Sequence, residues 1–293
     1  MKTFWATLLS VAVIPMAWCC DVCGCAGMMT GFGDLSLYPQ NTIGLSYLSR
    51  SFESSLGNRD HFTQLDISGR YVISPRWSVQ ATLPYLWGVR TRNEEDPTLI
   101  SGLGDASIGT RFTALYSGSE ESSRRLTLGA GVFLPTGRFE DRFGSLIPQN
   151  FQLGSGSWDY LLEGRYLHSE GDWVGMLEGR YVINTLNREA YKFGNQLGVQ
   201  LTLAHKLGFK KWALVPLLSV AWEHFKRDIN SRGYYQYGTG GEAFTASTGL
   251  QIKTASWLCS LRGGTNLTNG SGNYRPGPQL NFSVNYLFNS TKK

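Results

Sequence analysis

The feature that most constrains this chain is a repeated alternation of apolar and polar residues. Successive side chains of a β-strand point to opposite faces, so a half-apolar strand shows a period of two residues. The run 278–288 shows this alternation, with Leu280, Phe282, Val284, Tyr286 and Phe288 on one face. A helix, with a period of 3.6 residues, cannot gather such residues on one face. The run 76–89 is the clearest case, with one face formed by Trp77, Val79, Ala81, Leu83, Tyr85, Trp87 and Val89.

Similar runs separated by turn-forming residues predict about twelve antiparallel strands. Connections after even-numbered strands are mostly short, whereas those after odd-numbered strands are longer. Short periplasmic turns, longer extracellular loops and an even strand number are typical of a transmembrane antiparallel β-barrel. The runs also have the length of about nine to eleven residues that a tilted strand needs to cross a bilayer. The predicted strands are 41–52, 60–73, 76–89, 104–116, 125–135, 156–168, 172–184, 191–207, 211–225, 241–254, 256–268 and 278–288.

Composition agrees with an all-β membrane barrel. The mean hydropathy of -0.19 is too polar for a bundle of membrane helices, yet the apolar content is too high for a disordered chain. Lipid-facing apolar residues that alternate with polar lumen residues give such an average. The 27 basic residues are spread along the chain, which disfavours a nucleic-acid partner.

The N-terminus predicts export. Lys2 precedes a mostly apolar stretch from Phe4 to Met16, which is too short for a transmembrane helix and fits a signal peptide. Cleavage after Ala17 or after Cys19 is compatible with the sequence. We therefore expect the outer membrane of a Gram-negative bacterium, with membrane lipid around the barrel. The expected division is a signal peptide at 1–19, a Cys/Gly-rich segment at 20–40, a barrel at 41–288 and a tail at 289–293.

Three cysteines follow the predicted signal peptide: Cys20, Cys23 and Cys25. Closely spaced thiols suit soft ions such as Cu(I) or Zn(II). Disulfides are an alternative in the oxidising periplasm, and cleavage after Ala26 would remove the cluster. A retained segment would lie at the periplasmic mouth, where it would plug the lumen or dock a periplasmic metal-handling partner.

Charged residues occupy the faces opposite the apolar ones. A charge facing lipid near the bilayer midplane costs about 2–4 kcal/mol, so these side chains are expected to line the lumen. Two consecutive strands share the sequence Leu-Glu-Gly-Arg-Tyr, and a two-residue turn between them places Glu163 opposite Arg180 and Arg165 opposite Glu178. A structural brace and a part in solute passage both remain open. The predicted lumen residues are Asp66, Arg70, Arg111, Glu163, Arg165, Glu178, Arg180, Glu223 and Arg262.

Four short motifs carry a family resemblance: Leu83-Pro84-Tyr85, Gly102-Leu103-Gly104-Asp105, Leu134-Pro135-Thr136-Gly137 and the run 153–160. Glycine and proline permit tight bends at strand ends, and Asp105 and Asp159 are expected to cap turns or hydrogen-bond across the lumen. In order and spacing, the motifs resemble an outer-membrane family described as "putative MetA-pathway of phenol degradation", often labelled "transporter". The resemblance covers residues 60 to 290. It implies a β-barrel associated with uptake of aromatic or other hydrophobic compounds.

The sequence thus predicts an outer-membrane channel for passive movement of small solutes, including hydrophobic or aromatic ones. The alternative is a metal-binding or partner-docking protein that uses the barrel as an anchor. An enzyme is not expected, because the four histidines at 61, 168, 205 and 224 have no evident serine–aspartate constellation beside them.

Overall fold

The computed structural model describes residues 40–54, 58–92, 96–119, 121–139, 151–268 and 274–288. Throughout these ranges the regular structure is β-sheet. No helix among the described residues is long and apolar enough to span a membrane.

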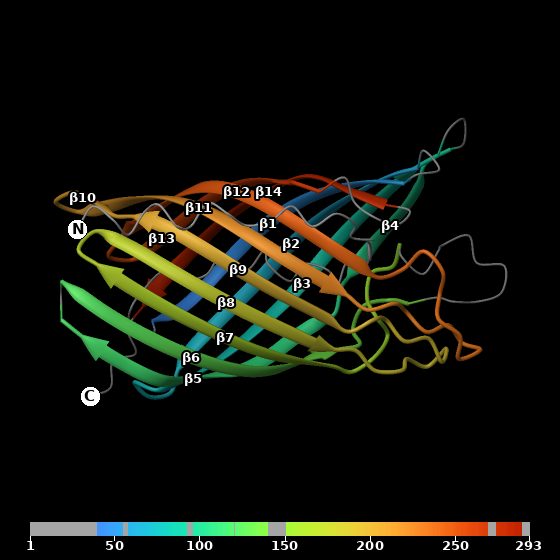
Figure 1. The fold of residues 1–293 in the computed structure, drawn as a ribbon, viewed down its shortest axis with the longest axis horizontal. Helices are drawn as coiled ribbons and strands as arrows, with labels where there is room; N and C mark the ends of the chain where they lie inside the picture. Colours follow the sequence, from blue (N-terminus) through green and yellow to red (C-terminus); the bar gives the residue numbers. More distant parts are fainter. Residues whose placement is uncertain are drawn as a thin grey trace, which may run out of the picture.

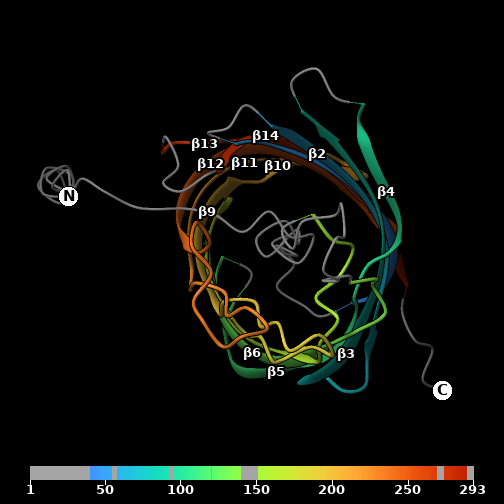
Figure 2. The ribbon, with the colours of Figure 1, turned by 90° about the vertical axis from the view of Figure 1, so that its right-hand side faces the viewer.

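Twelve long strands form one closed antiparallel barrel (Figures 1 and 2). Each strand pairs with its neighbours in sequence, and β1 closes the ring by pairing with β14 from Asn41–Phe288 to Ser54–Tyr274. The barrel strands are β1 (Asn41–Ser54), β2 (Arg59–Val72), β3 (Trp77–Thr91), β5 (Ala106–Gly118), β6 (Ser122–Leu134), β7 (Asp159–Glu170), β8 (Trp173–Ile183), β9 (Gln196–His205), β11 (Trp212–Phe225), β12 (Gly241–Thr254), β13 (Trp257–Asn266) and β14 (Tyr274–Phe288).

Two short strands lie off this ring. β4 (Thr98–Leu103) pairs with the C-terminal half of β3, and β10 (Leu207–Gly208) pairs with the start of β11. β4 lies at the outer edge of the ring when the barrel is viewed along its axis (Figure 2). The β3–β4 hairpin therefore extends the wall at one end of the barrel.

The outer surface is apolar and the lumen is polar, which reverses the arrangement of a soluble protein. Trp77, Leu83 and Trp87 of β3 are 48%, 41% and 42% exposed on the outside. Polar residues of the inner face, such as Ser219 and Gln251, are buried. Aromatic rings gather near the strand ends, where Trp257 lies 5.1 Å from Tyr286 between ring centres. A closed barrel with this apolar exterior and aromatic girdles is built to lie in a bilayer.

The strand predictions are confirmed with local corrections. The twelve predicted strands correspond to the twelve barrel strands, and the connections alternate between short and long, so we assign the short turns to the periplasm. The predicted strand 104–116 starts at Ala106, because Gly104 and Asp105 form a break between β4 and β5. The predicted strand 191–207 starts at Gln196, since residues 191–195 belong to a loop.

Candidate functional site

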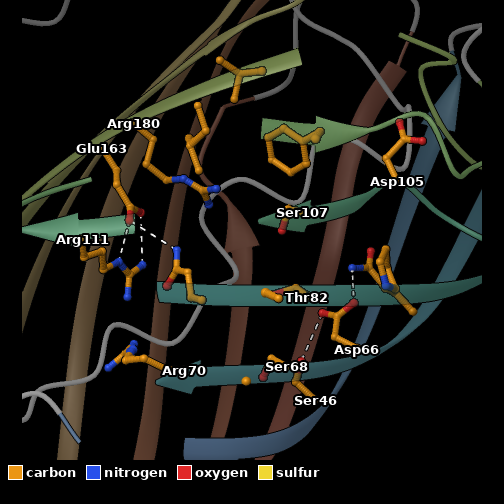
Figure 3. A pocket seen from close by; sticks show the side chains of 18 of the residues that line it. Ser46, Asp66, Ser68, Arg70, Thr82, Asp105, Ser107, Arg111, Glu163 and Arg180 are labelled. Atoms are coloured by element: carbon orange, nitrogen blue, oxygen red, sulfur yellow. Dashed lines mark hydrogen bonds and ion pairs between the residues drawn. The ribbon is translucent and has the colours of Figure 1, made fainter. Parts of the chain in front are cut away.

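The lumen contains a cavity of about 300 Å³ enclosed by β1–β3, β5–β8 and β14 (Figure 3). One part of its wall is apolar, and the rest is strongly polar. Most of both kinds of wall comes from the inward faces of the strands, and Asp105 and Leu153 are added by the connections between strands. The apolar part consists of Pro84, Leu86, Phe133, Leu153, Leu161 and Val182.

The predicted lumen residues form a belt around the inner wall. Seven of them line the large cavity: Asp66, Arg70, Arg111, Glu163, Arg165, Glu178 and Arg180. The other two, Glu223 and Arg262, line a second cavity of about 40 Å³ on the remaining arc of strands. Arg50, which the sequence analysis missed, joins them there. We call these ten side chains the charged belt.

Glu163 of the charged belt accepts hydrogen bonds from two other strands (Figure 3). It accepts hydrogen bonds from Arg111 Nε and Nη2, the second at 3.1 Å, and from Gln80 Nε2 at 3.5 Å. Arg111 lies on β5 and Glu163 on β7, so this ion pair bridges across β6. The register aligns both residues with Gly129 of β6. A side-chain carbon on Gly129 would lie 2.5 Å from Glu163 Cγ, so the bridge requires glycine here.

The β7–β8 hairpin has the predicted register. Glu163 is opposite Arg180, and Arg165 is opposite Glu178, across the two-residue turn between Glu170 and Trp173. Arg165 donates from Nε to Glu178 Oε1 at 2.7 Å. The added partner of Glu163, Arg111, could not be read from the hairpin, because it depends on the register of two further strand pairs.

Asp66 occupies a separate part of the cavity wall (Figure 3). Its carboxylate accepts a hydrogen bond from Gln64 Nε2 at 2.7 Å and one from Ser46 Oγ at 3.1 Å. Its hydrogen bonds therefore come from neutral donors on β1 and β2.

The break between β4 and β5 holds the connection between β6 and β7. Asp105 accepts hydrogen bonds from Gly137 N at 2.9 Å, Ser155 N at 2.6 Å and Ser155 Oγ at 2.9 Å. Thr136 Oγ1 donates to the Gly104 carbonyl at 2.7 Å and accepts from Ala106 N at 2.8 Å. Three of the sequence motifs thus meet at one point.

Asp159 extends this contact to the next loop. Its Oδ1 accepts from Ser157 Oγ and from Thr185 N, both at 2.8 Å. We call the group formed by Gly104, Asp105, Thr136, Gly137, Ser155, Ser157 and Asp159 the loop anchor. Gly154 packs against it so closely that a side-chain carbon there would collide with Asp105 and lie 2.8 Å from Gly137 Cα.

The far end of the same connection is fixed on β2 and β3. Phe151 is fully buried, 5.2 Å from the Phe62 ring and 4.6 Å from the Arg90 guanidinium carbon. Arg90 itself forms a buried, two-point ion pair with Asp60 at 2.6 Å and 2.5 Å. Residues 151–158 consequently run inside the ring (Figure 2). Leu153 of this segment forms part of the cavity wall.

Hydrogen bonds join the β8–β9 and β11–β12 loops at the same end. Asp228 accepts hydrogen bonds from the Tyr191 hydroxyl at 2.5 Å and from Gly194 N at 2.7 Å. Tyr191 and Phe193 are buried and pack against Phe139 of the β6–β7 connection. The loop end of the barrel is therefore a connected assembly of loops.

The described residues contain no group of three or more His, Cys, Asp or Glu side chains that could hold a metal ion. The candidate ligands Cys20, Cys23 and Cys25, like the predicted signal peptide and the tail at 289–293, lie outside the described residues.

The fold and the polar lumen define an outer-membrane β-barrel. The family model described as "Putative MetA-pathway of phenol degradation" matches residues 49–284, and the chain belongs to this family.

Solved structures show the same fold. The COG4313 outer membrane channel from Pseudomonas putida F1 is 17% identical, with a TM-score of 0.65, over 87% of this chain and 98% of that chain. The β domain of the Bordetella autotransporter BrkA is 9% identical, with a TM-score of 0.50, over 85% of this chain and 100% of that chain. A search of curated protein sequences finds no significant match.

Proposed function

We propose that this protein is an outer-membrane channel through which small hydrophobic solutes diffuse. The observation that carries the proposal is the cavity of about 300 Å³ inside a closed barrel, with an apolar wall from Leu86 to Val182. An apolar surface inside an otherwise polar lumen favours a solute that sheds water on entry. The chain shares its fold with a solved outer-membrane channel over nearly the whole of that channel's length, and this likeness supports the proposal.

We place an exit toward the bilayer at the break between β4 and β5. β5 begins at Ala106, which pairs with Leu134 of β6. On the loop side of Ala106 the wall continues as β4, which pairs with β3. Leu86, Asp105 and Leu153, which line the cavity, surround this break. A hydrophobic solute that enters past the loops would leave sideways through the wall at this break.

Uptake by cells tests the proposal. Cells that lack their own small-solute channels are given radiolabelled toluene, with and without this protein. Val182→Trp fills the cavity from β8 and should lower uptake several-fold, whereas Val220→Trp, at a lipid-facing position, should leave it unchanged. Equal uptake by cells with and without the wild-type chain would contradict the proposal.

The N-terminal cysteines carry a second candidate function, metal binding or docking of a periplasmic partner with the barrel as anchor. Its support is the spacing of Cys20, Cys23 and Cys25 in the sequence. Replacement of all three by serine should abolish Cu(I) or Zn(II) binding and leave toluene uptake unchanged. A wild-type chain that binds neither ion would refute the metal-binding role.

We propose no catalytic function. On the outer surface, Ser49 Oγ lies 3.3 Å from His61 Nε2, but Thr63 Oγ1 lies 3.5 Å from the same nitrogen. A serine nucleophile needs a histidine that is oriented by a further polar group. Among the described residues, the hydrogen bonds of His61 are those with these two hydroxyls, which fits a polar site at the membrane surface.

A further inference from the structure

The β8–β9 and β11–β12 loops contain the same five-residue turn, at 187–191 and 230–234. In both turns the first residue is asparagine, and its backbone N–H donates to the carbonyl of the fifth residue at 2.9 Å. The asparagine Oδ1 accepts from the N–H groups of the third and fifth residues at 2.9 to 3.1 Å. The fourth residue has a positive φ, 55° at Ala190 and 81° at Gly233. Alanine rarely adopts this conformation, so the surrounding bonds must hold the first turn in its shape.

The two turns are joined into one small sheet. We call residues 184–195 and 226–240 the loop sheet; its two loops lie side by side at the rim of the ring (Figure 2). Residues directly opposite each other in an antiparallel pair have their side chains on the same face. Leu186 and Tyr235, at the two edges of this face, are 62% and 71% exposed. The pairs that define the face are Leu186–Lys192, Lys192–Ile229 and Ile229–Tyr235.

The other face of the loop sheet is buried. Tyr191 and Phe193, which alternate with Lys192, pack against Phe139. A side-chain carbon on Gly156 would lie 2.9 Å from Phe139 Cβ, and Gly156 belongs to the segment that runs inside the ring. The exposed face therefore points away from that segment.

The loop sheet is predominantly basic. Its acidic residues are Glu189 and Asp228, and Asp228 is buried and hydrogen-bonded to Tyr191 and Gly194. The next acidic residue along the chain, Glu242, lies at the start of β12, 3.3 Å from His224 Nδ1. The basic residues of the loop sheet are Arg188, Lys192, Lys226, Arg227 and Arg232. The two arginines at 188 and 232 are exposed, one in each five-residue turn.

The loop sheet begins where the lipid-facing wall ends. The pairing of β9 with β11 reaches Gln196–Phe225, and the hydrogen bond from Lys226 N to the Asn195 carbonyl continues it at 2.9 Å. On the outer face just below, Trp222 stacks on His224, as aromatic residues do at a membrane interface. The outer leaflet of a Gram-negative outer membrane contains a glycolipid with phosphate groups on its sugars, and these groups lie next to this rim.

We propose that the loop sheet binds the phosphorylated sugars of this outer-leaflet glycolipid. Arg188, Lys192 and Arg232 attract the phosphates, since clustered basic residues bind anionic lipid head groups and guanidinium groups match phosphate in shape. Leu186 and Tyr235 contact the apolar faces of the sugars; a tyrosine ring suits a surface that is apolar on one side and wet on the other. The excess of positive charge favours this occupant over a second copy of the chain, which would bring the same charge.

Native mass spectrometry of the purified full chain in detergent tests the proposal. The probe is deep-rough lipopolysaccharide, which has lipid A and inner-core sugars, used intact or after chemical removal of its phosphates. The wild-type chain should bind the intact probe about ten-fold or more tightly than the dephosphorylated one. The combined variant Arg188→Gln, Lys192→Gln and Arg232→Gln should lose about the same factor for the intact probe. Equal binding of the two probes by the wild type would overturn the proposal.

The matched control removes three charges at the opposite end of the barrel. Lys206→Gln, Lys210→Gln and Lys211→Gln combined change the exposed periplasmic turn and should leave binding unchanged. Equal losses in the two triple variants would mean non-specific attraction and would refute the site. If the loop variant does not assemble, Arg232→Gln alone should weaken binding about three-fold, and unchanged binding would refute the site. A dimer that the loop substitutions abolish, in a wild-type chain that binds no lipid, would assign the face to a second copy instead.

Discussion

The charged belt and the loop anchor use acidic residues in different ways. In the belt, Glu163 bonds to side chains, so its partners lie in the wall and point into the lumen. In the anchor, Asp105 bonds mostly to backbone N–H groups of a connection that is far away in sequence. Belt residues therefore fix charges on the strands of the wall, whereas anchor residues, two of which also line the cavity, set where a loop lies. Substitutions in the two regions should have effects of different kinds.

The largest effect is expected for Asp105→Ala. This change removes the acceptor of three hydrogen bonds and leaves buried donors unsatisfied, at a cost of about 2–4 kcal/mol. The β6–β7 connection should detach and become sensitive to limited proteolysis. Asp105→Asn keeps one acceptor oxygen and should show a smaller effect. Protection equal to the wild type in Asp105→Ala would contradict the role of the anchor.

Gly154→Ala should also detach the β6–β7 connection, because the new carbon would press on Asp105 and Gly137. We expect the free energy of unfolding to fall by about 1–3 kcal/mol. The matched control is Gly179→Ala on β8, where nothing lies within 4 Å of an added carbon. Thermal unfolding and limited proteolysis of the two variants, measured side by side, provide the test. Equal behaviour would show that the close approach at Gly154 is not needed.

Gly129→Ala should act on the charged belt and leave the loop in place. The added carbon would push Glu163 away from Arg111, at a cost of about 1–2 kcal/mol in barrel stability. Ion selectivity should change while protease resistance of the loop does not. Gly263→Ala, with open space around the added carbon, serves as its control. A detached loop in Gly129→Ala would mean that belt and anchor are not separate.

The smallest effect is expected for Asp66→Asn. An amide can still accept one of the hydrogen bonds from Gln64 and Ser46, so stability should change by less than about 1 kcal/mol. The lumen loses one negative charge, so anion preference should rise modestly in the reversal potential measured under a potassium chloride gradient. A fall in anion preference would contradict the assignment of Asp66 to the lumen field.

Sequence reasoning recovered most of the wall, because a period of two residues specifies both the strand and the face. Leu83 and Trp87 face outward, and Asp66 and Arg180 line the cavity. The pairing of Glu163 with Arg180 followed from one short turn. The Arg111–Glu163 ion pair could not be predicted, since it depends on the registers of β5–β6 and β6–β7 and on the absence of a side chain at Gly129.

Only the separate turns of the loop anchor could be predicted from the sequence. The sequence indicated bends at Gly104–Asp105 and near Gly137, and hydrogen bonding by Asp105, but not that the bends meet. That meeting depends on residues 151–158 lying inside the ring beside Gly104, Asp105 and Gly137, which no local pattern specifies. The short strand β4 was also missed, because Gly104 and Asp105 separate it from β5.

Single-channel conductance of the wild-type chain and Asp105→Ala, measured side by side in planar bilayers, tests the central claim most directly. The claim is that the lumen is a solute path narrowed by an anchored loop. The account predicts a small, steady conductance for the wild type and a larger one for Asp105→Ala. A wild-type channel that conducts as well as Asp105→Ala would contradict it.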